Sequence, residues 1–413
     1  MYNKTNTGFK SKPRHFKSKF SRFRGGSSFN KDRPNPRRFN PYNQESLKHD
    51  LYISKAEDFN VTTEDIYDLN TTFEDFRLHP KLLKNIKERN YKNPTKIQSQ
   101  VMKPILDSKD VLGLASTGSG KTAAFLIPVL NFLINDPKKK CLIIAPTREL
   151  VNQIQAEYQK FAQGTMVRDA LIVGGASYAP QIRLLRRNPQ LVIATCGRLI
   201  DLFKTKQINL NEFDIIVLDE VDQMLDMGFI HDIKLIVSSL KEQKQSLFFS
   251  ATMNSKIEEI ANSFLQNPVK IEIAKQGSAK NVDQNIVKIH HSKSKLDTLH
   301  EILVNTEFDK VLVFSKTKRG AEELSIQLKN KGHKAEALHG DKSLGQRMRI
   351  MSSFRKNEIL ILIATDVAAR GIDIPDISHV INYDEPATRE DYIHRIGRTG
   401  RIGKKGVALT FVK

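Results

Sequence analysis

The chain contains only two cysteines among its 413 residues, and it lacks the features that mark secreted or membrane proteins. Cys141 and Cys196 lie far apart and form no CxxC pair, so neither a disulfide framework nor a zinc site is predicted. No apolar run is long enough to span a bilayer, and no apolar segment of the secretory type follows the basic N-terminus. We therefore expect a soluble, cytoplasmic protein without a membrane partner.

Acidic residues are scarce relative to basic ones, and the shortage is greatest at the N-terminus. The net charge is +20, and residues 1–40 carry twelve Lys or Arg with one acid, Asp32, which places +11 in that segment. A surplus of this size predicts an anionic partner, with nucleic acid favoured over an acidic membrane face. Residues 1–45 show no periodicity, so we expect a disordered tail whose cations and six Phe tether nucleic acid. A merely solubilising extension is the alternative.

The rest of the chain alternates short continuous apolar runs with longer amphipathic stretches. Runs that are apolar at every position predict strands buried on both faces, as in parallel sheets. Helical stretches such as 319–331, which Gly332 can end in a left-handed cap, complete βαβ units. The predicted strands are 111–115, 141–145, 191–194, 215–218, 247–250, 311–314, 359–364, 379–383 and 407–412.

This pattern predicts an α/β protein with two doubly wound, mostly parallel sheets. The predicted segments are the tail at 1–45, an acidic adaptor at 46–70, a first domain at 71–274, a hinge at 275–281 and a second domain at 282–413. Most unusual polar clusters directly follow an apolar run. They therefore lie at the carboxyl ends of parallel strands, where open α/β sheets bind ligands.

A glycine-rich loop follows the first predicted strand and precedes a helical stretch. Glycines let successive N–H groups turn around phosphate oxygens, and the following helix directs its positive end at them. We predict that Lys121 reaches the β- and γ-phosphates of ATP and that the Thr122 hydroxyl binds Mg²⁺. With Ala115, the loop has the pattern of a Walker A motif and consists of Ser116, Thr117, Gly118, Ser119, Gly120, Lys121 and Thr122.

Two acids end the apolar run at 215–218. Asp219 is predicted to hold Mg²⁺, and Glu220 to orient and deprotonate the attacking water. Selection of adenine requires an aromatic face and an amide that both donates and accepts hydrogen bonds. The candidates for this role are Phe73, Tyr91, Pro94, Thr95 and Gln98.

Residues 70–413 resemble the motif set of DEAD-box RNA helicases, a group within helicase superfamily two. The motifs occur in the family's order, and a dozen in order across two domains is a very strong signal. They comprise the Q motif (73, 90–91 and 94–98), motifs I (115–122), Ia (146–150), GG (174–175), Ib (195–198), II (219–222), III (250–252), IV (313–316), V (364–373) and VI (394–401). The resemblance implies tandem RecA-like domains and an ATP-dependent RNA helicase that unwinds short duplexes and remodels ribonucleoprotein.

The resemblance also implies that the second domain completes the ATP site. Arg398 and Arg401 resemble arginine fingers, which reach the γ-phosphate only when the domains close and can contribute about 10³ to 10⁵ in rate. Gly371 and Asp373 would contact the nucleotide, Asp373 at the ribose. Closure of the two domains would therefore be coupled to hydrolysis.

Further roles follow from the same resemblance. Asp222 and His394 would meet across the cleft, with Ser250 and Thr252 bridging, and would couple hydrolysis to closure. RNA would be held through its phosphates and sugars without reading of sequence. The implied RNA contacts are Thr147, Arg148, Gly175, Thr195, Arg198, Lys316, Thr365 and Arg370.

The chain departs from the family's motifs at four positions. Motif II reads DEVD, with Val221 between the acids, and Asn90 replaces a usual Gly that tolerates a left-handed cap. Cys196 replaces a usual Pro, which loosens the φ restraint of that turn. Leu344 replaces the Gln of the QxxR element, and we expect this change to weaken one RNA contact.

Two other functions share this domain plan. One is a DNA-directed superfamily-two helicase, which the Q motif and the string HRIGRTGR disfavour. The other is an ATP-gated RNA clamp with slow turnover, which the retained Glu220, Arg398 and Arg401 disfavour. The core is expected to be monomeric, and ribosome assembly, mRNA decay, cold adaptation and translation initiation all fit the same sequence.

Overall fold

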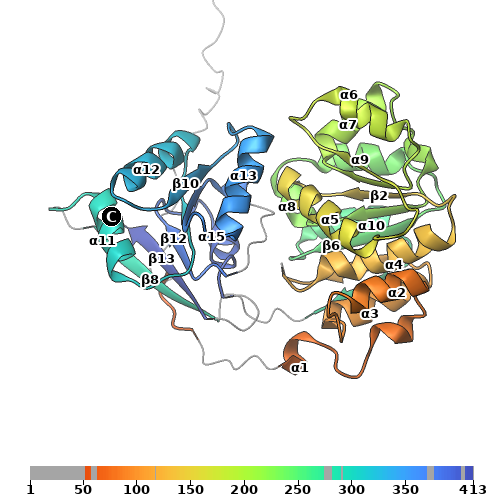
Figure 1. The fold of residues 1–413 in the computed structure, drawn as a ribbon, viewed down its shortest axis with the longest axis horizontal. Helices are drawn as coiled ribbons and strands as arrows, with labels where there is room; N and C mark the ends of the chain where they lie inside the picture. The colour runs from red at the N-terminus through yellow and green to blue at the C-terminus, as the bar shows by residue number, and fades with distance from the viewer. Residues whose placement is uncertain are drawn as a thin grey trace, which may run out of the picture. The chain divides into compact units, whose positions relative to one another are not determined.

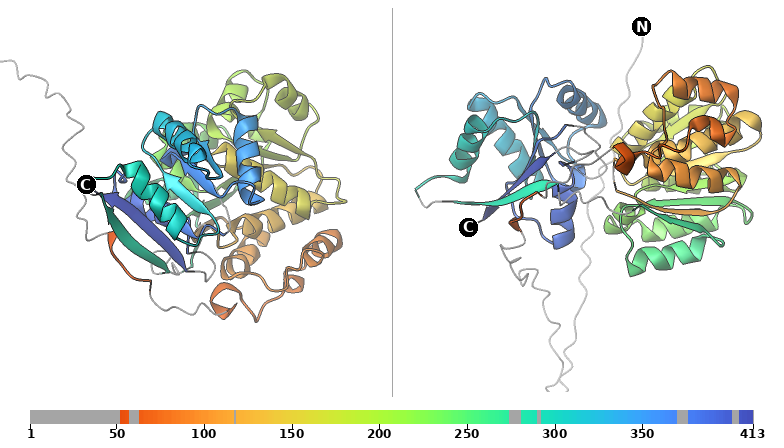
Figure 2. Two further views of the ribbon diagram at one scale, coloured as in Figure 1. Left: turned by 60° about the vertical axis from the view of Figure 1, so that its left-hand side comes forward. Right: turned by 90° about the horizontal axis from the view of Figure 1, so that it is seen from below.

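The computed structural model describes residues 52–56, 63–116, 118–273, 281–289, 292–369, 376–400 and 405–412. Figures 1 and 2 show two sheets with helices packed on both faces of each. We call residues 63–273 the first lobe and residues 281–412 the second lobe. The predicted tail lies outside the described residues, as does the predicted hinge up to residue 280.

The first sheet has the order β3-β4-β2-β5-β6-β1-β7, and all its strand pairs are parallel. Neighbouring residues of each central strand enter different cores: Val111 of β1 packs in one core and Leu112 in the other. Continuous apolar runs are therefore required, since both faces are covered by helices. The strands are β1 (Val111–Leu114), β2 (Cys141–Ile144), β3 (Asp169–Ile172), β4 (Leu191–Ala194), β5 (Ile215–Leu218), β6 (Gln245–Ser250) and β7 (Val269–Glu272).

The helices of the first lobe mostly follow strands, as the crossover connections of a parallel sheet require. No helix among the described residues is both long enough and apolar enough to cross a membrane. The helices are α1 (Thr63–Ile66), η2 (Phe73–Phe76), α2 (Pro80–Lys87), α3 (Lys96–Leu106), α4 (Lys121–Asn135), α5 (Arg148–Phe161), α6 (Tyr178–Leu185), α7 (Cys196–Lys204), η3 (Leu210–Glu212), α8 (Val221–Asp226), α9 (Ile230–Ser238) and α10 (Ser255–Phe264).

The second sheet has the order β10-β11-β9-β12-β13-β8, again with every pair parallel. Its strands are β8 (Val282–Lys288), β9 (Val311–Phe314), β10 (Ala335–Leu338), β11 (Ile361–Ala364), β12 (His379–Asn382) and β13 (Gly406–Val412). Its helices are α11 (Lys295–Asn305), α12 (Lys318–Asn330), α13 (Leu344–Arg355), α14 (Asp366–Ala369) and α15 (Arg389–Ile396). The predicted pair of doubly wound α/β sheets is confirmed.

All nine predicted strands are present within two residues of their predicted bounds. Gly332 and Asn90 take the left-handed φ angles expected of them, 89° and 58°. Four strands were missed, namely β3, β7, β8 and β10. Three of them, β3, β7 and β8, alternate buried with partly exposed positions and lack a continuous apolar run.

Candidate active site

The glycine-rich loop lies between β1 and the N-terminus of α4, as predicted. Gly118 and Gly120 have positive φ angles of 84° and 94°, a conformation that glycine adopts without steric cost. The Lys121 side chain is buried, and its Nζ donates a 2.6 Å hydrogen bond to the Ala115 carbonyl. The Ser119 hydroxyl hydrogen-bonds within the loop. Thr117 lies outside the described residues.

Gln98 connects the predicted adenine-reading segment to this loop. Its Oε1 accepts a hydrogen bond from the Thr95 N–H at 3.0 Å, and its Nε2 donates to the Gly120 carbonyl at 3.1 Å. Tyr91 and Gln98 line the cavity described below. The structure corrects the expectation for Phe73, which is 1% exposed and packs edge-on against Tyr91. Its ring belongs to the hydrophobic core and not to the cavity.

Asp219 and Glu220 follow β5 and are 2% and 6% exposed. Glu220 has a φ of 54°, a strained value for a residue with a side chain, and strain of this kind persists where a site depends on it. Burial raises the pKa of Asp219 to about 6. Burial, followed by the Asp219 charge, raises the pKa of Glu220 to about 7, while the Lys121 charge acts in the opposite direction. Both groups are therefore poised to exchange protons near neutral pH.

Asp222 joins the end of β5 to the end of β6. Its Oδ2 accepts hydrogen bonds from the N–H groups of Ala251 and Thr252, both at 3.1 Å, and from the Thr252 hydroxyl at 3.2 Å. The Ser250 hydroxyl donates to the Thr252 carbonyl at 2.7 Å. Asp222, Ser250 and Thr252 are thus brought together within the first lobe. The pairing of Asp222 with His394 stays a prediction.

A cavity of about 800 Å³ unites these groups, a size typical of ligand sites. Lys121, Asp219 and Glu220 line it from the first lobe and Arg398 from the second. Arg398 is 6% exposed, and its charge lowers the pKa of Glu220, so the two groups lie within electrostatic reach. Sequence reasoning missed several lining residues on amphipathic helices, where nothing distinguishes them from ordinary surface positions. These are Asn152, Gln153, Ala156, Glu157, Lys160, Met348, Met351, Ser352, Arg355 and Lys356.

Arg395 and Arg398 have different surroundings although they are three residues apart. Arg395 donates through Nε and Nη2 to the two carboxylate oxygens of Asp366 at 2.6 and 2.7 Å, and through Nη1 to the Asp384 carbonyl at 2.6 Å. Its guanidinium lies over the Phe314 ring. Arg395 therefore fixes α15 to the second sheet, a role that sequence reasoning missed. The predicted residues Gly371, Asp373 and Arg401 lie outside the described residues.

A second cavity, of about 300 Å³, gathers four of the predicted RNA contacts. The Arg198 Nη1 donates to the Ala176 carbonyl at 2.9 Å, and its guanidinium lies 3.8 Å from the centre of the Tyr178 ring. Such stacking fixes the orientation of the planar cation. The four predicted residues in this cavity are Thr147, Arg148, Thr195 and Arg198.

The other predicted RNA contacts lie outside this lining. Gly175 has a φ of 76° and approaches the Arg148 guanidinium so closely that no side chain would fit there. Lys316 and Thr365 follow strands β9 and β11 of the second sheet. Arg370 lies outside the described residues.

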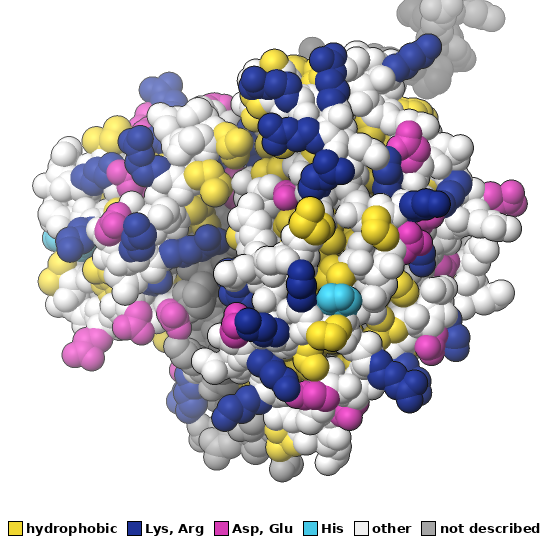
Figure 3. Space-filling view, turned by 45° about the vertical axis from the view of Figure 1, so that its right-hand side comes forward, with side chains coloured by type: hydrophobic (Ala, Val, Ile, Leu, Met, Phe, Trp, Pro, Cys, Tyr) yellow, Lys and Arg dark blue, Asp and Glu magenta, His cyan; other side chains and the backbone are white. Residues whose placement is uncertain are grey.

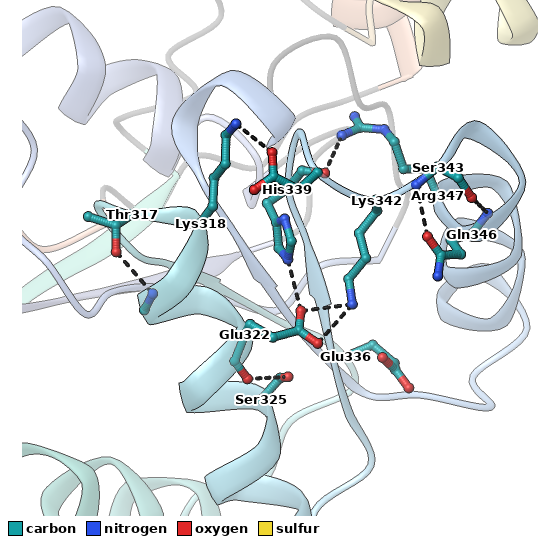
Figure 4. A network of polar contacts seen from close by, with 12 residues as sticks. Thr317, Lys318, Glu322, Ser325, Glu336, His339, Lys342, Ser343, Gln346 and Arg347 are labelled. Atoms are coloured by element: carbon teal, nitrogen blue, oxygen red, sulfur yellow. Dashed lines mark hydrogen bonds and ion pairs between the residues drawn. The ribbon is translucent and has the colours of Figure 1, made fainter. Parts of the chain in front are cut away.

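Arg347 contacts the first lobe. Its Nε donates to the Glu149 Oε1 at 2.5 Å, and the two side chains are 8% and 5% exposed. Its Nη1 donates to the His339 carbonyl at 3.0 Å, as Figure 4 shows. A His339 ring nitrogen lies 2.8 Å from Glu322, which also accepts from Lys342, so this network holds the turn before α13 in place.

Substitution of Gly120 by Ala is expected to raise the KM for ATP at least about tenfold. The added Cβ would lie 2.6 Å from the Gln98 Nε2, and the positive φ of Gly120 would strain any side chain. Steady-state ATP hydrolysis measures the effect. Gly345→Ala is the matched control, because a Cβ there meets no atom within 4 Å. A wild-type KM in Gly120→Ala would contradict the assignment of this loop.

Family models match both lobes. The model for the DEAD/DEAH box helicase matches residues 95–260, and the model for the helicase conserved C-terminal domain matches residues 294–403. This chain belongs to the DEAD-box RNA helicase family. The predicted resemblance is confirmed, as are the two tandem RecA-like domains.

Curated relatives support the same assignment. The helicase is 42% identical over 346 residues to the DEAD-box ATP-dependent RNA helicase CshA of Bacillus licheniformis, covering 83% of this chain and 71% of that protein. It is 41% identical over 380 residues to the DEAD-box ATP-dependent RNA helicase 30 of Arabidopsis thaliana, covering 90% and 64%. The prediction of an ATP-hydrolysing RNA helicase is confirmed.

Solved structures resemble this helicase over both lobes. Saccharomyces cerevisiae Dbp5 bound to RNA and ADP BeF3 matches with a TM-score of 0.73 and 33% identity over 83% of this chain and 89% of that one. Mss116p bound to ssRNA and AMP-PNP matches with a TM-score of 0.74 and 30% identity, covering 87% and 77%.

The four departures from the family's motifs are accommodated locally. Val221 is fully buried in the core of the first lobe. The Cys196 sulfur lies 3.8 Å from the Met224 sulfur, also in that core. Leu344 packs against the other core of the first lobe, so it supplies an apolar contact where a Gln would be polar.

Proposed function

We propose that this helicase couples RNA-stimulated ATP hydrolysis to closure of its two lobes, and thereby separates short RNA duplexes locally and remodels ribonucleoprotein. The observation that carries the proposal is the cavity lined by Lys121 and Glu220 from one lobe and by Arg398 from the other. Hydrolysis that needs groups from both lobes proceeds only when the lobes are together. The second cavity is also lined from both lobes, so RNA favours the same arrangement.

The buried carboxylate and the two cations have complementary tasks in this proposal. Glu220, whose pKa lies near neutrality, accepts a proton from the attacking water. Lys121 and Arg398 stabilise the negative charge that develops on the transferred phosphoryl group. Since these side chains are almost fully buried, their charges act with little screening by solvent.

The donor set fits a magnesium ion that enters with ATP. Asp219 and Thr122 offer oxygen ligands, and the Glu220 Oε2 is buried without a hydrogen-bond partner. Among the described residues, no three His, Cys, Asp or Glu side chains gather into a metal site. Phosphate oxygens and water would therefore complete the coordination, as Mg²⁺ prefers. When bound, the ion neutralises charge on the phosphates.

RNA is proposed to bind through its backbone, without sequence preference. Thr147, Arg148, Thr195 and Arg198 share one cavity. On the face drawn in Figure 3, Lys and Arg side chains gather toward the top with few acids between them. One chain supplies both halves of each site, so a monomeric core suffices.

Strand separation under excess ATP tests the proposal. Catalytic amounts of protein should separate a short RNA duplex, and RNA should stimulate ATP hydrolysis more than DNA of equal length and sequence. Stronger stimulation by DNA would indicate a DNA-directed helicase instead. Retention of RNA in long-lived complexes without strand separation would indicate an ATP-gated clamp.

Deletion of residues 1–45 is expected to weaken RNA binding and reduce its salt dependence. This segment carries a large basic surplus, and each cation bound to a single-strand phosphate adds about 0.7 to the slope of log K against log salt. Loss of five such contacts lowers the slope by about 3. Fluorescence anisotropy at several KCl concentrations measures it, and ATP hydrolysis at saturating RNA should hardly change.

A variant with the six Phe of this segment replaced by Ala is the matched control for charge. It removes stacking partners, so affinity should fall while the salt slope remains that of the full chain. An unaltered slope after deletion of residues 1–45 would refute the RNA tether.

A further inference from the structure

A short segment that precedes the first lobe pairs with the edge of the second sheet. Ser54 and Gln284 form an antiparallel bridge, in which the Ser54 N–H donates to the Gln284 carbonyl at 3.0 Å and the Gln284 N–H donates to the Ser54 carbonyl at 2.6 Å. The Ala56 N–H donates to the Asp283 Oδ1 at 2.8 Å. Since β8 is an edge strand, this segment covers backbone groups that would otherwise face solvent.

The Tyr52 ring anchors the segment. It is 0% exposed, and its centroid lies 4.8 Å from that of Tyr392. The Tyr392 hydroxyl donates to the Gln284 Oε1 at 2.8 Å, so the ring contact and the strand pairing share one polar link. The apolar cluster around the two rings consists of Val282, Ile396, Ala408 and Val412, with Ile286 packed against it.

The anchored ring packs against α15, the helix that leads to Arg398. Tyr392 and Ile396 of α15 contact the Tyr52 cluster, whereas Arg398, two residues beyond Ile396, lines the ATP cavity with Glu220. Helices pack as rigid units, so removal of a large ring from one side leaves a cavity into which α15 can shift.

We propose that residues 52–56 form a docking segment for the second lobe, and that Tyr52 is a positioning residue for α15 and thereby for Arg398. The segment also makes a second covalent route between the lobes, because Tyr67 pairs with Thr95 of the first lobe. Eleven peptide units join Ala56 to Tyr67, which limits their separation to about 40 Å while the segment is docked. Such a limit raises the effective concentration of one lobe near the other.

Tyr52→Ala in the full chain should weaken docking and slow catalysis. The Gln284 amide should exchange its hydrogen at least about tenfold faster once the Ser54 carbonyl is withdrawn. The kcat at saturating ATP and RNA should fall on the order of tenfold with the KM for ATP little changed, because displacement of a catalytic group by 1 Å can cost about 10²-fold. Hydrogen exchange and steady-state kinetics provide the two measurements.

The segment offers two matched controls. The Tyr52 hydroxyl is buried without a hydrogen-bond partner, so Tyr52→Phe should keep the wild-type exchange rate and kcat. Ile53 is 53% exposed on the neighbouring position, so Ile53→Ala should change neither.

Ser54→Pro removes the donor to Gln284 while every side chain of the Tyr52 cluster remains, so it should act in the same direction as Tyr52→Ala. It keeps the test valid if Tyr52→Ala lowers the yield of folded protein. Unchanged exchange at Gln284 in both variants would show that the segment is not docked in solution. Faster exchange with wild-type kcat would overturn the positioning role of Tyr52.

Discussion

Replacement of Glu220 by Gln is expected to lower RNA-stimulated ATP hydrolysis by about 10²- to 10⁴-fold, the usual contribution of a general base. The amide cannot accept the proton of the attacking water, although it has nearly the shape of the carboxylate. Binding of ATP should persist, because Lys121 and the glycine-rich loop are unchanged. Single-turnover hydrolysis with saturating RNA measures the loss, and retention of more than a tenth of wild-type turnover would contradict the role of Glu220.

The same substitution should stabilise the nucleotide-free protein. Burial raises the pKa of Glu220 from 4.5 to about 7, so the folded state disfavours the ionised form. The stability of the wild type with this group protonated is therefore lost as pH rises through about 7. Since one pKa unit corresponds to about 1.4 kcal/mol, Glu220→Gln should gain up to about 3 kcal/mol above pH 7 and much less at pH 5.

Thermal unfolding in EDTA at several pH values measures this gain. Glu157→Gln is the control, because Glu157 lines the same cavity but is partly exposed and pairs with Lys160. It should change neither turnover nor the pH dependence of unfolding. An equal gain for Glu220→Gln at pH 5 and pH 8 would show that titration of Glu220 is not its cause.

The central strands and the phosphate loop could be predicted because each is encoded in a few consecutive residues. A run such as 215–218 is buried on both faces, and the acids that follow it must lie at the ligand edge of a parallel sheet. Edge strands carry no such signal. In β8 only Val282 and Gln284 are buried, so half of the strand has the composition of a surface loop.

Contacts between distant segments could not be predicted from local patterns. Ser54 pairs with Gln284, 230 positions away, and the segment around Tyr52 was interpreted only as part of an acidic adaptor. Phe73 shows the converse case, because its place in a motif predicts proximity to the nucleotide but not the direction of its ring. Arg347 was expected among RNA contacts, and its partner Glu149 lies in the other lobe.

Replacement of Arg398 by Ala is expected to lower kcat by about 10³-fold or more while leaving the unfolding temperature nearly unchanged. Arg398 lines the ATP cavity, and its charge already lowers the pKa of Glu220, so it lies where charge develops during hydrolysis. Arg398→Lys should also be impaired, since an ammonium group lacks the planar fork of donors. The kcat with saturating ATP and RNA, measured beside thermal unfolding, gives both quantities.

Arg395→Ala separates this catalytic effect from a structural one. Arg395 is 3% exposed and binds both carboxylate oxygens of Asp366, so its removal leaves that acid without its partner and should cost about 2 to 3 kcal/mol of stability. The two variants should therefore differ in kind: Arg395→Ala lowers the unfolding temperature, and Arg398→Ala lowers turnover in a stable protein. Wild-type turnover in Arg398→Ala would show that the second lobe does not complete the catalytic site, because Arg398 is the cation of that lobe closest in effect to Glu220 among the described residues.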